Sequence, residues 1–176
     1  MIEPIKNQPI LTPSDYLFRH EDLDDGMVKN WFDVYEKFEN EINLYQTLFY
    51  SKRLFIETRF LNIATALESF HSKFFNNQII YQKRILELLE NKNILFRKVI
   101  KDFDDFSKIV KDSRNKFVHH EVKQDSIERS KLIWAIYILR FLFEAYLLEI
   151  IGFSDEKIEK IYEKRMEKYL KFGSKF

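Results

Sequence analysis

The sequence predicts an all-α protein in which a single bundle of helices forms the core. Its three prolines (Pro4, Pro9 and Pro13) all precede Ser14, and its 176 residues include only three glycines, so little opposes helix after that point. Apolar residues then recur at helical spacing, and no alternating strand pattern extends beyond a few residues. With 45% apolar and 32% charged residues, the chain has the composition of a globular domain.

The helices are predicted from this spacing in chain order. Residues 1–25 are expected to form an irregular lead-in, and residues 26–176 the helical domain. The expected helices cover about 28–49, 54–75, 79–89, 94–100, 102–117, 126–151 and 155–168. Asn76-Asn77 and Asn91-Lys92-Asn93 are expected to separate helices, and Gly152 is a suitable left-handed cap residue. Ser154 is expected to cap the last helix.

The segment 132–151 is the most apolar in the chain, and we interpret it as the central helix of the bundle. A membrane span is disfavoured because Arg140, Glu144 and Glu149 would each cost roughly 2.5–3.5 kcal/mol near a bilayer centre. Arg140 and Glu144 lie four residues apart and can pair with each other.

Composition excludes several classes of function. The chain has no cysteine, which removes thiol nucleophiles, disulfides and Cys-based zinc sites and is compatible with the cytoplasmic location that we expect. No signal peptide is expected, because no basic and apolar leader pattern opens the sequence. No glycine-rich phosphate loop, GxSxG or HExxH motif occurs, so no cofactor is predicted. The net charge is +1, although residues 81–123 carry +4 and the remainder −3.

The second predicted helix carries polar residues along one stripe. Glu57, Leu61, Ala64, Glu68 and His71 fall within about 80° of arc. One interpretation is an acid–base cluster of two carboxylates and an imidazole. The other, which we favour, is an exposed face or a set of carboxylates that receive basic groups from a neighbouring helix.

The segment KDSRNKFVHHE, residues 111–121, contains the residues best suited to catalysis. His119 could act as a general base on a ribose 2′-OH, because imidazole titrates near neutral pH. The planar guanidinium of Arg114 matches the charge that accumulates on phosphate oxygens. On a regular helix the two residues lie about 140° apart. Either the helix bends near Asn115, or two chains combine their motifs across a two-fold axis.

A metal site at His119-His120 is not expected. Adjacent residues of a helix point to different sides, so such a site would need carboxylates from other helices.

Two motifs resemble the HEPN superfamily, whose members share an Arg followed after four to six residues by His. Here that motif reads RNKFVH, Arg114 to His119. The segment 53–75 is similar to the corresponding helix of ApeA-type abortive-infection proteins, with Arg59-Phe60-Leu61, Ala66-Leu67-Glu68 and His71. The resemblance extends from roughly Trp31 to Ile151.

The resemblance implies a HEPN-type helical bundle that forms a homodimer with a composite active site. It implies a metal-independent endoribonuclease that cleaves host RNA, such as tRNA, during anti-phage abortive infection. Arg114 and His119 would be catalytic, with Asn115 supporting them. His120, Glu57 and Glu68 are expected as further supporting residues.

We also expect Lys111, which precedes the motif, and Lys116, which lies within it, to contact RNA. ApeA-like proteins carry a domain before the HEPN part, and no separate domain precedes Trp31 here. The chain is therefore expected to be a fragment or a stand-alone HEPN protein, which leaves a sensor domain or an antitoxin as possible partners.

Two alternatives remain. The chain could be a non-catalytic HEPN module for dimerisation or nucleotide binding, which the intact Arg114–His119 pair disfavours. It could also be the toxin of a pair with a nucleotidyltransferase-like antitoxin. Tyr-containing motifs near the histidine can be modified in that system, and no Tyr follows closely after His119.

Overall fold

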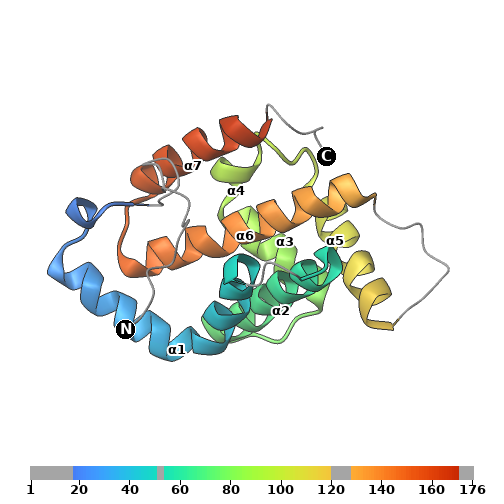
Figure 1. Cartoon of the computed structure of the whole chain (residues 1–176), viewed down its shortest axis with the longest axis horizontal. Helices are drawn as coiled ribbons and strands as arrows, with labels where there is room; N and C mark the ends of the chain where they lie inside the picture. The colour runs from blue at the N-terminus through green and yellow to red at the C-terminus, as the bar shows by residue number, and fades with distance from the viewer. Residues whose placement is uncertain (1–17, 51–53, 120–127, 171–176) are drawn as a thin grey trace, which may run out of the picture.

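The predicted all-α fold is confirmed. The computed structural model describes residues 18–50, 54–119 and 128–170, and these residues contain seven α-helices, one short 3-10 helix and no strand (Figure 1). The elements are η2 (His20–Asp22), α1 (Asp25–Tyr50), α2 (Ile56–Phe75), α3 (Tyr81–Asn91), α4 (Asn93–Phe96), α5 (Phe103–His119), α6 (Arg129–Ile151) and α7 (Asp155–Leu170). Most of the predicted irregular lead-in, residues 1–17, lies outside the described residues.

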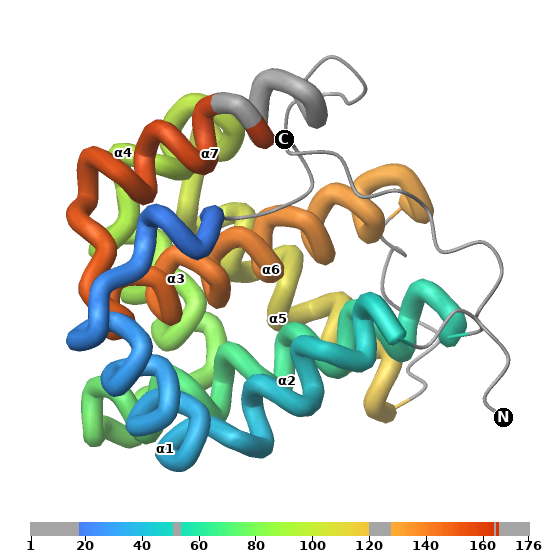
Figure 2. The backbone as a smooth tube through the Cα atoms, turned by 60° about the vertical axis from the view of Figure 1, so that its left-hand side comes forward, coloured from blue at the N-terminus to red at the C-terminus, as the bar shows by residue number. Residues whose placement is uncertain are grey.

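Helix α6 runs through the middle of the bundle (Figure 1). It packs against α1, α2 and α7, while α5 packs against α2 and α3 on another side (Figure 2). Every residue from Phe141 to Leu148 is buried, so α6 is enclosed on all sides over this stretch. This confirms the interpretation of 132–151 as the central helix. None of the described helices has the length and apolarity needed to cross a membrane.

The helix boundaries agree with most of the sequence signals. Asn76 ends α2 in the left-handed conformation with φ 50°, and Gly152 ends α6 with φ 119°. The amide of Lys157 donates to the hydroxyl of Ser154 at 3.3 Å, which confirms the predicted cap of α7. Helix α4 is shorter than the predicted 94–100 because it ends at Phe96 and the chain continues as a turn.

Helix α1 buries only part of its apolar surface. Val34, Phe38 and Ile42 are buried, whereas Val28, Trp31, Phe32 and Phe49 are exposed. At 100° per residue the apolar stripe of the first turns lies roughly 75° away from the stripe that faces the core. Phe38 also has a non-helical conformation (φ −119°, ψ 27°), so the helix is kinked between its two halves.

The carboxylate of Glu144 joins three helices in the interior. Its exposed fraction is 2%, and it accepts hydrogen bonds from Arg140 Nε at 2.7 Å and Arg165 Nη1 at 2.9 Å. The hydroxyls of Tyr45 and Tyr162 donate to the same carboxylate. Burial raises the pKa of both tyrosines, and the negative charge of Glu144 acts in the same direction. The predicted Arg140–Glu144 pair is therefore confirmed as part of a larger network between α1, α6 and α7.

Replacing Glu144 with alanine is expected to destabilise the bundle. The change leaves two partly buried guanidinium groups without their carboxylate, which typically costs about 3–5 kcal/mol. Urea denaturation followed by circular dichroism measures the free energy of unfolding. As a control, Glu36→Ala on the exposed face of α1 should change that free energy by less than about 0.5 kcal/mol. Equal effects of the two substitutions would contradict a structural role for the Glu144 network.

Candidate active site

Arg114 is held between three helices. It projects from α5, and its Nη2 donates to Oε2 of Glu68 on α2 at 2.7 Å. Its guanidinium carbon lies 4.7 Å from the centre of the Tyr81 ring, at the start of α3. The side chain is 28% exposed, so solvent still reaches part of it. The ion pair and the ring together fix the plane of the guanidinium.

Two polar atoms at this point are buried without a hydrogen-bond partner among the described residues, namely Arg114 Nε and the Tyr81 hydroxyl. Burial raises the pKa of Tyr81, and Arg114 opposes this only in part, so the phenol stays protonated. A buried polar group without a partner costs about 1–3 kcal/mol and is uncommon away from functional sites. The site therefore has more hydrogen-bond donors than acceptors, which suits an anionic ligand.

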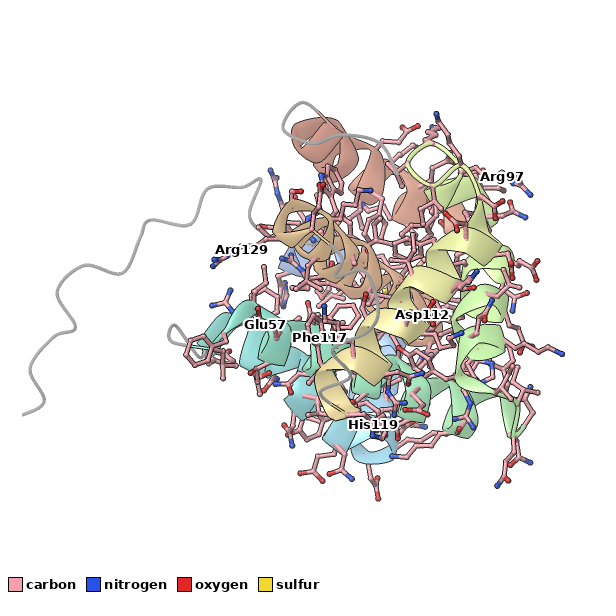
Figure 3. All side chains as sticks on the ribbon, turned by 90° about the vertical axis from the view of Figure 1, so that its right-hand side faces the viewer. Glu57, Arg97, Asp112, Phe117, His119 and Arg129 are labelled. Atoms are coloured by element: carbon pink, nitrogen blue, oxygen red, sulfur yellow. The ribbon has the colours of Figure 1, made fainter. Side chains whose placement is uncertain are left out.

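His119 lies apart from Arg114 in the single chain. Helix α5 continues without interruption from Phe103 to His119, so the bend near Asn115 that we considered is not present. Arg114 and His119 are therefore about 140° apart around the helix axis. Arg114 faces α2 and α3, while His119 is exposed at the end of the helix (Figure 3).

Helices α2 and α5 run antiparallel along their contact. Arg114 meets Glu68, and three residues later the Phe117 ring packs on Phe60 with ring centres 5.8 Å apart. Positions nearer the C-terminus of α5 therefore contact positions nearer the N-terminus of α2. His119 consequently lies toward the N-terminal end of α2, where Glu57 is exposed, on the face of the molecule seen in Figure 3.

The other residues predicted around the motif are Lys111, Asn115, Lys116 and His120. Lys111 Nζ contacts Asp112 at 2.9 Å, so its charge is partly offset. Asn115 and Lys116 are half-buried on α5. His120 lies outside the described residues. Within the described part of the chain, no three His, Asp or Glu side chains gather as metal ligands would.

The polar stripe of α2 does not form an acid–base cluster. Glu68 receives Arg114 from α5, as the favoured interpretation predicted, whereas His71 is fully buried and its Nε2 lies 2.8 Å from Oε2 of Glu87 on α3. Glu57 remains exposed at the far end of the helix. The three side chains share a face of α2, but different neighbouring helices contact them.

Tyr81 and Arg84 contribute to the site, although sequence analysis did not identify either residue. Arg84 Nη1 donates to the backbone carbonyl of Glu68 at 3.2 Å and to the hydroxyl of Ser72, which fixes α3 against α2. This contact sets the position of Tyr81 beside Arg114. No spacing pattern links α3 to α5, so only the packing of the helices reveals these residues.

Comparison with known proteins identifies the family of the chain. The family model described as Apea-like HEPN matches residues 61–157, which is more than half of the chain and includes Glu68, Arg114 and His119. No curated protein and no solved structure gives a significant match.

His71 should make the stability of the fold depend on pH. Burial lowers its pKa below the usual 6.5, although Glu87 acts in the opposite direction. Well above pH 6.5 the imidazole of His71 is neutral in the folded and in the unfolded chain. Below pH 6.5 the unfolded chain takes up a proton on His71 more readily than the folded chain does. Stability should therefore fall as the pH drops from about 7 to about 5.

Urea denaturation at these two pH values measures the effect. His71→Gln should show a smaller loss of stability on acidification than the wild type. His20→Gln, on the exposed η2, should behave as the wild type does. Identical pH dependences of stability for the wild type and His71→Gln would contradict the role of His71 in the loss of stability on acidification.

Proposed function

Since the chain belongs to the ApeA-like HEPN family, we propose that it is a metal-independent endoribonuclease whose catalytic groups are Arg114 and His119. The observation that carries the proposal is the immobilised guanidinium of Arg114. Glu68 of α2 and Tyr81 of α3 hold this guanidinium in place. Helix α5, which carries Arg114, ends in the exposed His119. An arginine fixed in this way is prepared for a phosphodiester before any substrate arrives.

The proposed reaction is transesterification by the ribose 2′-OH. His119 removes the proton of the 2′-OH, whose oxygen then forms a bond to the adjacent phosphorus. The bond between phosphorus and the 5′ oxygen breaks, and this oxygen takes up a proton as it leaves. The products are a 2′,3′-cyclic phosphate and a 5′-hydroxyl. Arg114 stabilises the charge on the non-bridging oxygens, with Asn115 supporting the pair.

The continuity of α5 favours a site shared between two chains. Because Arg114 and His119 lie about 140° apart in one chain, one phosphate is more readily reached by Arg114 of one chain and the histidine of a second. A two-fold axis would create two such pairs. We accordingly propose a homodimer as the active form.

For the biological role, we propose abortive defence against phage in the cytoplasm, with host RNA such as tRNA as the substrate. This proposal follows from the family membership. A sensor domain or an antitoxin would then control the activity.

A second candidate is a non-catalytic HEPN module for dimerisation or nucleotide binding. The observation that favours it is the engagement of Arg114 with Glu68, together with the separation from His119. Growth of bacteria that express the wild type or His119→Ala separates the two candidates. Equal growth, with no RNA cleaved in vitro, would support the non-catalytic module.

Substitution of either proposed catalytic residue should slow cleavage by at least about 10²-fold. His119→Ala is expected to slow cleavage by about 10²–10⁴-fold through loss of the general base. Arg114→Lys keeps the charge but loses the planar fork, and should slow it by about 10²–10³-fold. Cleavage is measured on labelled RNA in EDTA, and circular dichroism should show unchanged helix content, with His20→Ala as the control. A strict requirement for Mg²⁺, or products without 2′,3′-cyclic phosphate, would contradict the mechanism.

Mixed dimers should test whether the site is shared. A dimer of one Arg114→Lys chain and one His119→Ala chain would retain one intact pair if each pair spans both chains, but none if it lies within one chain. Co-expression should therefore restore about a quarter of the wild-type activity, because statistical assembly gives half mixed dimers with one working site each. Absence of any restoration in purified mixed dimers would argue against a pair contributed by two chains.

A further inference from the structure

A pocket of about 540 Å³ lies between the C-terminal end of α1, the N-terminal end of α2 and the first half of α6. Its polar lining consists of Glu57, Arg59, Arg129, Tyr137 and Arg140. Phe49, Phe55 and several aliphatic residues complete its walls. The proposed catalytic residues Arg114 and His119 are not among its lining residues, so the pocket is a separate feature.

The lining holds three arginines and one glutamate, so it remains positive by one charge after the Arg140–Glu144 ion pair is counted. Arg140 is only 16% exposed, and it is held by Glu144 at 2.7 Å and by the Phe49 ring at 4.8 Å from its guanidinium carbon. This arginine is therefore part of a preformed wall. In the described part of the chain no carboxylate forms an ion pair with Arg129, which is exposed.

The place of Arg129 in α6 is unfavourable for the helix. It is the first residue of α6, where the helix dipole disfavours a positive charge. Arg59 lies in the fourth position of α2, also near the positive end of its helix. Two helix starts and two cations thus converge on one pocket. An anionic ligand at Arg129 would offset the positive charge at the start of α6.

Two phenylalanine rings at the pocket are exposed to solvent and are not packed in the core. Phe55 is 78% exposed and Phe49 is 46% exposed, and Tyr137 lies on the wall formed by α6. Aromatic faces beside arginines are the combination on which nucleic acid bases stack while their phosphates are neutralised.

The pocket lies at the N-terminal end of α2, toward which the contact between α2 and α5 leads. Arg59 immediately precedes Phe60, whose ring packs against the ring of Phe117. From Glu57 to Glu68, α2 extends over roughly 16 Å at 1.5 Å per residue. Glu57, Phe117, His119 and Arg129 are visible together on one face in Figure 3. A single strand bound at Arg114, beside Glu68, therefore has a path of about 16 Å along α2 to the pocket.

We infer that this pocket binds a nucleoside phosphate, with the phosphate at Arg129 and Arg59 and the base against the rings of Phe55 and Tyr137. The inference rests on the proposed function in one respect, namely that the nucleoside phosphate belongs to an RNA strand that also reaches the catalytic pair. A free nucleotide has the same chemistry and is the other source.

The test measures binding to the full-length protein without any cleavage. A fluorescent single-stranded oligonucleotide with 2′-O-methyl riboses cannot undergo transesterification, and its anisotropy reports affinity at several salt concentrations. Arg129→Gln should weaken binding about fivefold or more and reduce the slope of log K against log salt by about 1. Phe55→Ala should weaken binding by a similar factor and leave that slope unchanged.

Matched controls lie outside the pocket. Lys131→Gln removes an exposed charge two residues further along α6, and Ile94→Ala removes an exposed apolar side chain on α4. Both controls should bind as the wild type does. Unchanged affinity and salt dependence in Arg129→Gln and Phe55→Ala would overturn the inference, as would losses of the same size in the controls.

Two further measurements separate the possible occupants. A nucleoside 5′-monophosphate that binds the wild type, loses affinity in Arg129→Gln and is not displaced by the oligonucleotide identifies a free nucleotide as the source. Light scattering reports oligomeric state, and dissociation of the dimer by Phe55→Ala without loss of RNA affinity would show that a second copy of the chain covers the pocket, which overturns the inference.

The outcomes also distinguish this inference from the proposed function. If the wild type cleaves no RNA but Arg129→Gln still weakens binding, the pocket is supported and the nuclease assignment fails. If the wild type cleaves RNA and neither pocket variant affects binding, the nuclease assignment stands and the pocket inference fails.

Discussion

The relative positions of α1, α6 and α7 depend on one buried carboxylate, that of Glu144. A charge this far from water is tolerated only with partners, and Glu144 has them on α1, α6 and α7 at once. The three helices therefore cannot shift independently without leaving a charge uncompensated. The same carboxylate orients Arg140, whose other face stacks on Phe49. An interaction inside the core thus extends to the wall of a surface pocket.

A second carboxylate, Glu68, has a comparable effect at the surface. It occupies one N–H of Arg114, while the Tyr81 ring determines the plane of the guanidinium. Since a guanidinium has five N–H donors, the contact leaves others for a ligand. The cost of ordering a long side chain is met during folding, before any ligand binds. In both networks a carboxylate orients an arginine that also faces solvent.

The sequence predicted those features that arise within one helix or at its ends. The bounds of α2, the left-handed Gly152 and the Arg140–Glu144 pair all depend on residues within a few positions of each other. Features that depend on distant segments were missed. The exposure of Trp31 and Phe32 reflects which face of α1 its neighbours cover, and spacing alone does not reveal it.

The candidate site shows the same contrast between local features, which the sequence predicts, and contacts between distant segments, which it does not. The residues Arg114 and His119 could be chosen from the sequence because their chemistry and spacing are local. Their surroundings could not, since Tyr81 comes from another helix and His71 turns toward Glu87 rather than toward Glu57 or Glu68. The less favoured interpretation of the α2 stripe, an acid–base cluster, does not hold for this reason, because side chains on one helix face can contact different helices.

The unbroken course of α5 has a consequence for dosage. Under the proposed function, an isolated polypeptide has no complete catalytic pair, because α5 directs Arg114 and His119 to different sides, and mass action then governs how many complete pairs exist. At low abundance the number of such pairs rises with the square of the amount of polypeptide. If the protein acts as proposed, a cell tolerates a small standing quantity of it, and a modest rise in synthesis produces a disproportionate response.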